Sequence, residues 1–250
     1  MNFYLGTDRL NWLTMTELAD VPLFVSHRGL SKRKHLQPAP MRWGLDSGGF
    51  TELTMHGEWQ TTPHSYIAAV RRYNDEIGNL DFASPQDWMC EPHMIKRTGL
   101  SIAEHQRRTI NSVLTLRTLS PQLPIIPVLQ GWTLTDYLSH AEQYDRAGIN
   151  LENEPLVGVG SICRRQATWE AAEIAMRLQP IKLHAFGAKQ DAIGLYGSLL
   201  TSADSMAWSY GGRMKPDPNC PKRSCAHCLH YALNWRSKAM TPQRLTLWGA

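Results

Sequence analysis

The sequence has no long hydrophobic run and only a small excess of charge. No apolar stretch approaches the roughly 20 residues that a helix needs to cross a bilayer. The N-terminal segment MNFYLGTD has neither the basic start nor the long apolar core of a signal peptide. The net charge of +4 is too small to indicate a polyanionic partner by itself. We therefore expect a cytoplasmic globular protein whose function must be sought in local motifs.

The sequence also lacks the GxxxxGK[ST] loop that binds nucleotide phosphates, and it has no internal repeat or low-complexity segment. These absences argue against a P-loop nucleotide hydrolase and against a repeat protein. The chain has 250 residues and a hydrophobic share of 42%, which is enough for a large core. This length suits a single α/β barrel, which usually needs about 250 residues.

Eight short apolar runs alternate with longer amphipathic stretches. The apolar runs span residues 3–5, 22–25, 43–45, 80–83, 125–129, 156–159, 182–186 and 203–207. The amphipathic stretches span residues 10–19, 64–77, 102–119, 135–147, 168–178 and 191–199. This alternation predicts parallel βαβ units, and eight strands in one chain favour an α/β fold of the (β/α)8 TIM-barrel type. We expect the barrel to occupy about residues 1–212.

Polar residues and glycines follow the predicted strands. They are Arg28 after the second strand, Asp46, Ser47, Gly48, Gly49 and Phe50 after the third, Asp87 after the fourth, Gln130 and Gly131 after the fifth, Gly158, Val159 and Gly160 at the end of the sixth, and Asp204 in the eighth. The carboxyl ends of barrel strands meet on one face, so we expect these residues to surround one pocket.

An aspartate at a strand end is often only a helix cap or a turn former. Three of them on one face can also divide chemical work. One carboxylate can attack a sugar C1′ and a second can move a proton, which is the usual equipment for cleaving a bond at an anomeric carbon. Gln130 could read a carbonyl on a heterocycle or bond to neighbouring backbone. The glycines could serve turns or let backbone approach a planar base.

The densest basic cluster is SHRGLSKRKH, residues 26–35, which includes Arg28, Lys32, Arg33 and Lys34. Such a cluster is either a solvated surface loop or a site that contacts phosphates. Because it follows the second predicted strand, we expect it on the pocket face, which favours phosphate contacts.

Three of the five cysteines lie in the segment NCPKRSCAHCLH, residues 219–230. Cytosolic thiols stay reduced, so a disulfide framework is not expected. Cys220, Cys225 and Cys228, completed by His230 or His227, match a tetrahedral Cys3His zinc site better than a redox CxxC pair. Four protein ligands leave no open position, so we predict a structural Zn2+ in a segment of about residues 213–238.

Six motifs in fixed order resemble the tRNA-guanine transglycosylases. They are DSGGF at 46–50, VLQG at 128–131, VGVGS at 157–161, LHAFGA at 183–188, ADSMAW at 203–208, and the Cys3His segment. The opening FYLGT with VPLFVSHR is similar to the compact DpdA branch of that superfamily. That branch places 7-deazaguanine bases into DNA and occurs in phages and bacterial DNA-modification clusters.

The resemblance implies base exchange, with Asp204 as nucleophile and Asp46 moving the proton. It places Asp87 and Gln130 on the polar edge of the base and the Gly158–Val159–Gly160 backbone on the other side. It also places Ser47, Gly48, Gly49, Phe50 and Gly131 at the substrate. The expected partners are DNA and a 7-deazaguanine base such as preQ0, and dimerisation, common in the family, makes a homodimer a further expectation.

The sequence also departs from the larger family. It is much shorter than typical tRNA enzymes of that family, so we expect no appended RNA-binding domain, and the family's CxCxxC spacing is here Cys220-x4-Cys225-x2-Cys228. Three alternatives remain at this stage. They are a transglycosylase acting on tRNA, a non-catalytic subunit that binds nucleic acid, and a barrel glycosidase acting on carbohydrate.

Overall fold

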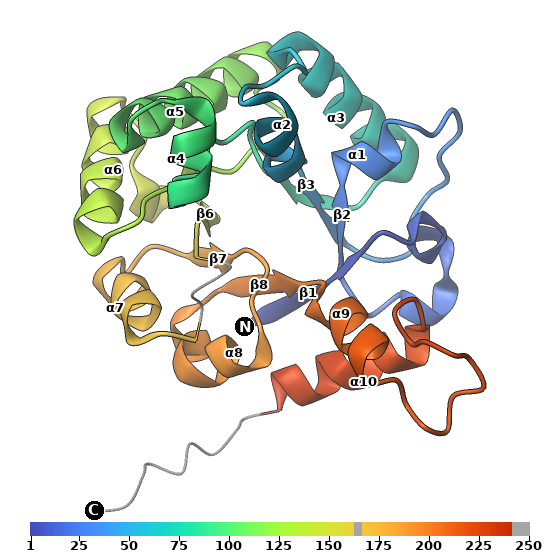
Figure 1. Ribbon diagram of the computed structural model, residues 1–250. Coiled ribbons are helices and arrows are strands. Elements are labelled where there is room, and N and C mark those ends of the chain that lie inside the picture. The colour runs from blue at the N-terminus through green and yellow to red at the C-terminus, as the bar shows by residue number, and fades with distance from the viewer. Residues whose placement is uncertain (163–166, 242–250) are drawn as a thin grey trace, which may run out of the picture.

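The computed structural model describes residues 1–162 and 167–241 and shows an eight-stranded parallel sheet surrounded by helices (Figure 1). The strands are β1 (Asn2–Thr7), β2 (Leu23–Ser26), β3 (Trp43–Asp46), β4 (Leu80–Ala83), β5 (Val128–Leu129), β6 (Val157–Val159), β7 (Leu183–Ala185) and β8 (Ser202–Ser205). Their spatial order is β4-β3-β2-β1-β8-β7-β6-β5, and every pairing is parallel. The predicted α/β class with eight parallel strands is confirmed.

The sheet curls so that its two edge strands approach each other. Ala83 of β4 forms an isolated parallel bridge with Ile125, three residues before β5. The Ala83 N–H donates to Pro124 O at 2.9 Å, and the Ile126 N–H donates to Ala83 O at 3.1 Å. β5 is shorter than the predicted 125–129 strand because Pro127 has no N–H to donate to a ladder.

The helices lie outside the curled sheet (Figure 1). The α-helices are α1 (His27–Leu30), α2 (Gly49–His56), α3 (Pro63–Ile77), α4 (Pro92–Thr98), α5 (Ile102–Leu119), α6 (Leu134–Arg146), α7 (Trp169–Arg177), α8 (Gln190–Tyr196), α9 (Ala207–Met214) and α10 (Leu229–Met240). Short 3-10 turns are η1 (Leu10–Thr14), η2 (Thr16–Leu18), η3 (Leu151–Asn153) and η4 (Gly197–Leu199). No helix in the described ranges is both long and apolar enough to span a membrane.

Side-chain caps explain why several helices begin where the sequence predicts. Thr62 accepts a hydrogen bond from the Ser65 N–H before α3, and Ser101 accepts one from the Glu104 N–H before α5. Thr168 caps α7 by accepting from the Ala171 N–H at 3.3 Å. Each cap satisfies a backbone donor that the first helical turn leaves without a partner.

The predicted helix over residues 10–19 is wrong. The structure has two 3-10 turns there, separated by Met15 in an extended conformation. The apolar side chains Trp12, Leu13 and Leu18 are still buried, so the apolar pattern reflected burial rather than a continuous helix. Trp12 stacks on Trp208 of α9, which ties this segment to the C-terminal part of the chain.

Candidate active site

A pocket of about 330 Å3 lies at the carboxyl ends of the strands. Its described lining residues are Gly6, Thr7, Phe24, Ser26, Asp46, Gly49, Phe50, Ser84, Asp87, Met89, Glu91, Gln130, Gly160, Ser161, Phe186, Gly187, Asp204 and Met206. Parallel strands deliver these side chains together because all their carboxyl ends point the same way. The predicted convergence of strand-end residues is therefore present.

Only some of the predicted substrate-binding residues line the pocket. Asp46, Gly49, Phe50, Asp87, Gln130, Gly160 and Asp204 line it, whereas Ser47, Gly48, Gly131, Gly158 and Val159 do not. Gly48 has a φ of 83°, a left-handed conformation that turns the chain from β3 into α2. Ser47 donates toward Asp87 Oδ1 at 3.4 Å, so it acts behind the lining rather than in it.

The two glycines of the VGVG segment make room for protein side chains. A Cβ on Gly158 would lie 2.5 Å from Cε2 of Phe186, and one on Gly160 would lie 2.2 Å from Nε2 of Gln130. Any side chain at Gly160 would therefore displace the Gln130 amide from the pocket wall. These glycines keep the positions of Phe186 and Gln130, a role that spacing alone does not reveal.

Four carboxylates line the pocket, namely Asp46, Asp87, Glu91 and Asp204. Among the described lining residues none is a lysine, arginine or histidine. A surface with this many acceptors favours a ligand rich in N–H donors. A guanine-like base, with its ring N–H and exocyclic amine, has that character.

Asp46 ends β3 and faces Asp204 across the pocket. Its carboxylate accepts hydrogen bonds from the Ser26 hydroxyl and the Gly48 N–H. Burial is the largest influence and raises the pKa of Asp46, and the nearby charge of Asp204 raises it further. A carboxyl whose pKa is raised can hold a proton and donate it, which suits a general acid.

Asp87 and Gln130 form a hydrogen-bonded pair. Gln130 Nε2 donates to Asp87 Oδ2, and the Gln130 N–H donates to Nδ1 of the buried His140. Burial first, and then the charge of Asp46, raise the pKa of Asp87 to about 7. Together the pair presents both an acceptor and an amide to a ligand.

Ser161 and Glu91 extend this network, and sequence reasoning did not select either residue. The Ser161 hydroxyl lies 2.6 Å from Gln130 Oε1 and 2.9 Å from Glu91 Oε2, and it accepts the Cys90 N–H at 2.7 Å. Ser161 has a φ of 57°, which is uncommon for a residue other than glycine. Its only sequence signal is its place at the end of VGVGS, and Glu91 has none beyond lying four residues after Asp87.

Asp204 is 6% exposed and lies on β8, which has β1 on one side and β7 on the other. Its Oδ1 accepts the Gly187 N–H at 2.9 Å and lies 3.4 Å from Nε2 of His184. These contacts come from β7 and the loop after it, so neighbouring strands fix the carboxylate in place.

The predicted basic cluster divides into two parts. Arg28 is exposed beside the pocket, and its Cγ would lie 2.7 Å from a Cβ on Gly48. Lys32, Arg33 and Lys34 are exposed in the loop after α1. Arg72 of α3 donates to the carbonyls of Arg33 and Lys34, each at 2.9 Å, which fixes the loop while leaving its side chains in solvent.

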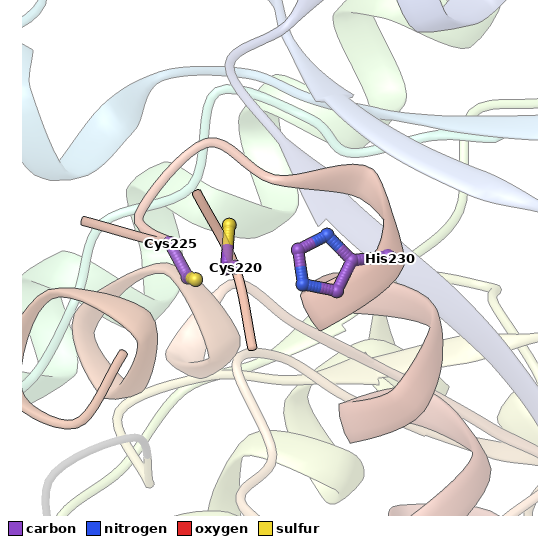
Figure 2. Close-up of side chains that lie close together, drawn as sticks. All are labelled: Cys220, Cys225 and His230. Atoms are coloured by element: carbon purple, nitrogen blue, oxygen red, sulfur yellow. The ribbon is translucent and has the colours of Figure 1, made fainter. Parts of the chain in front are cut away.

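The predicted zinc ligands come together at the start of α10 (Figure 2). The ligand atoms of Cys220, Cys225 and His230 all lie within 4.8 Å of one another, and the sulfurs of Cys220 and Cys228 are 3.8 Å apart. His227 instead has its Nδ1 3.8 Å from Asp8 Oδ1. Three thiols and one imidazole form a donor set that could bind a metal ion and suits tetrahedral zinc. The geometry favours His230 over His227 as the fourth ligand.

Comparison with known proteins gives one family. The sequence model of the family DpdA, described as DeoxyPurine in DNA protein A, matches residues 1–246. No curated protein matches the chain.

Proposed function

The chain belongs to the DpdA family, and from this premise we propose that it exchanges guanine in DNA for a 7-deazaguanine base such as preQ0. Membership supports a role in deoxypurine modification of DNA and agrees with the resemblance read from the motifs. The proposal of guanine exchange rests on one observation. Asp46 and Asp204 line the same pocket as the hydrogen-bonded Asp87–Gln130 pair.

In the first half of the proposed reaction, guanine leaves and a covalent intermediate forms. The target nucleotide is flipped out of the stack into the pocket, where Asp87 and Gln130 bind the polar edge of the base. One carboxylate oxygen of Asp204 forms a bond to C1′ while the C1′–N9 bond breaks. The electron pair leaves with guanine, and Asp46 supplies the proton that the departing base takes up.

The second half reverses these movements with a different base. Asp46, now ionised, accepts a proton from the incoming 7-deazaguanine. The base nitrogen forms the new bond to C1′, and the electron pair of the C1′–O bond returns to Asp204. No strand of DNA is cut, and the exchange needs no nucleotide hydrolysis.

The test is base exchange with purified protein. Labelled guanine is placed in duplex DNA, single-stranded DNA or tRNA, and preQ0 is added. Release of label from DNA is the expected result. Release from tRNA alone would overturn the DNA proposal in favour of the RNA alternative, and no release from any substrate would overturn the enzymatic proposal in favour of a binding subunit.

We further propose that the strands form a complete (β/α)8 barrel over about residues 1–212, which carries a zinc-binding segment of about residues 213–238. The bridge between Ala83 and Ile125 supports closure. Ser47, Gly48, Gly131, Gly158 and Val159 would support the base-binding residues from behind rather than touch the base. A cytoplasmic location, a homodimer and a phage origin stay predictions.

Asp87→Asn is expected to weaken base binding and to remove its dependence on pH. The carboxylate form of Asp87 accepts the N–H groups of guanine, and its pKa of about 7 means that binding strengthens as pH rises from 6 to 8. The amide cannot ionise, so the variant should bind about 10- to 100-fold more weakly with a flat pH profile. Calorimetric titration with preQ0 checks this, and a profile that keeps its slope in the variant would assign the titration to another group.

The same substitution should stabilise the fold at high pH. Because the folded-state pKa of Asp87 is raised, the folded chain binds more protons than the unfolded chain between about pH 4 and 7. Stability is therefore lost as pH rises through that window, and an asparagine does not suffer this loss. Urea unfolding at pH 5 and pH 8 measures the free energy of unfolding of both proteins. Relative to the unchanged protein, that of the variant should be higher at pH 8 than at pH 5, by on the order of 1–2 kcal/mol.

Replacing Lys32, Arg33 and Lys34 by alanine is expected to weaken DNA binding for every sequence. Each lost phosphate contact reduces the slope of log affinity against log salt by about 0.9, so the slope should fall by about 1 to 3. Fluorescence anisotropy at several salt concentrations measures it.

A control for this loss removes three exposed basic residues elsewhere, Arg146, Arg177 and Lys182. Arg146 ends α6, Arg177 ends α7, and Lys182 comes just before β7. These positions lie toward the amino ends of the strands, whereas the pocket lies at their carboxyl ends. The control should keep the salt slope. Equal salt slopes for the loop variant and the unchanged protein would show that the loop does not contact DNA phosphates.

A further inference from the structure

His184 does not line the pocket, but its Nε2 lies 3.4 Å from Oδ1 of the lining residue Asp204, and it has no role in the proposed reaction described above. The imidazole is fully buried on β7. The rings of Tyr4, Phe24, Phe82 and Phe186 surround it, with centroids 4.8 to 5.9 Å away. A polar ring buried among aromatic side chains needs partners for both nitrogens. In the described ranges the nearest are Ser202 Oγ, 2.8 Å from Nδ1, and Asp204 Oδ1, 3.4 Å from Nε2.

The two partners determine which nitrogen carries a proton. Nε2 faces a carboxylate oxygen, so it must carry hydrogen, because two lone pairs would repel. In the neutral ring Nδ1 is then an acceptor, and the Ser202 hydroxyl donates to it. In the charged ring both nitrogens carry hydrogen and Ser202 accepts. In either state an N–H points from His184 toward Asp204.

The strand geometry makes this arrangement rigid. Ser202 and Asp204 are two residues apart on β8, so both side chains leave the same face of the sheet. His184 of β7 pairs directly with Ser202 in the ladder. The His184 ring therefore reaches from Ser202, the first residue of β8, to the carboxylate of Asp204 two residues further along the strand.

The contacts at Asp204 distinguish its two oxygens. Oδ1 receives the Gly187 N–H at 2.9 Å and faces His184 Nε2. Within the described residues Oδ2 receives no hydrogen bond. The separation of 3.4 Å to His184 is long for a hydrogen bond, but such contacts often tighten when substrate binds. Oδ2 is thus the oxygen with lone pairs available to a sugar carbon.

We propose that His184, held by Ser202, is a positioning residue that holds Oδ1 of Asp204 and presents Oδ2 to C1′. The inference rests on the proposed base exchange and deepens it. When Oδ2 bonds to C1′, Oδ1 becomes the carbonyl oxygen of the ester, keeps the hydrogen bond from the Gly187 N–H, and receives the N–H of His184 as that contact shortens. When the incoming base attacks C1′, the C1′–Oδ2 bond breaks, and the same donors stabilise the carboxylate that re-forms.

The test compares His184→Phe with His184→Gln in base exchange. Phenylalanine keeps a buried ring but has no N–H, whereas glutamine can place an amide N–H near the position of Nε2. We expect kcat to fall about 10- to 100-fold in the phenylalanine variant, with KM within about threefold. Glutamine should recover part of that loss, and Ser202→Ala, which frees the ring, should show a smaller fall.

Leu116→Ala is the structural control, because Leu116 is fully buried on α5 and is not a pocket-lining residue. It should lower the melting temperature without lowering kcat. An unchanged kcat in His184→Phe would overturn the inference, as would a glutamine variant no better than phenylalanine. Absence of exchange in the unchanged protein would instead overturn the proposed function itself.

A spectroscopic measurement tests the geometry without turnover and covers the case in which the phenylalanine variant does not fold. Side-chain 15N chemical shifts of His184 report which ring nitrogen carries hydrogen. Hydrogen on Nε2 is expected, with a shift that changes in Asp204→Asn. A neutral ring with its hydrogen on Nδ1 would overturn the proposal.

Discussion

Asp204→Asn is expected to abolish base exchange and the covalent DNA adduct, with a loss of at least about 1,000-fold in kcat. An amide oxygen is a poor nucleophile, and its ester-like adduct with C1′ would carry a positive charge. The substitution keeps shape, and asparagine Oδ1 can still accept the Gly187 N–H that Asp204 accepts at 2.9 Å. The loss should therefore be chemical rather than structural. Release of labelled guanine and mass spectrometry of the enzyme incubated with DNA but no incoming base measure the two effects.

Asp46→Asn is the matched comparison, since the residue lines the same pocket and the substitution is the same. That variant keeps the proposed nucleophile and loses the proposed proton donor, so it should form adduct slowly rather than not at all. An adduct that survives in Asp204→Asn and disappears in Asp46→Asn would show that Asp46, rather than Asp204, is the nucleophile. Asp145→Asn, at an exposed position on α6, should change neither rate nor adduct.

The strand ends of the pocket were predictable from the sequence because two simple regularities combine. Apolar runs of strand length alternate with amphipathic stretches, and the residue that follows each run lies on one face of a parallel sheet. Asp46 and Gln130 follow this rule and line the pocket, as does Asp204, which lies within the eighth run rather than after it. Predicted and observed bounds agree best for residues 80–83 and 102–119, where β4 and α5 occupy the same spans.

Other parts depend on contacts between distant segments, which periodicity does not encode. Helices α2 and α4 were not predicted, although α2 begins inside the DSGGF motif, because glycine at its start argues locally against a helix. Gly160 is needed because of Gln130, thirty residues earlier in the chain. His184 becomes informative only when β7 and β8 lie side by side and bring Ser202 and Asp204 to its two nitrogens.

Cys228→Ser is expected to lose stoichiometric zinc and most of the soluble folded protein. Structural zinc contributes on the order of 10 kcal/mol of folding free energy to small domains. Here the cluster also ties α9 and α10 to the sheet. The Cys225 N–H donates to Gly212 O of α9 at 2.9 Å, and Arg236 of α10 donates to Phe3 O of β1 at 3.2 Å. The zinc content measured by metal analysis should fall from about one ion per chain to well below one.

The loss should also reach the pocket, because β1 is the neighbour of β8, the strand that carries the proposed nucleophile Asp204. Tyr4 of β1 pairs with Asp204 of β8, and Trp208 of α9 donates to Gly6 O at 2.8 Å. Without the metal, α9 and α10 lose their common anchor, and both contacts weaken. Any soluble Cys228→Ser protein should therefore melt earlier and exchange bases more slowly than the unchanged chain.

Two controls separate ligation from general damage. Cys90→Ser alters a buried thiol that lies outside the cluster and should leave the zinc content at one per chain. His230→Ala should lose zinc, whereas His227→Ala, whose ring faces Asp8, should retain it. Unchanged zinc content in Cys228→Ser would remove this residue from the ligand set. Retention in His230→Ala together with loss in His227→Ala would show that the imidazole ligand is the one facing Asp8, and that the loop rearranges around the metal.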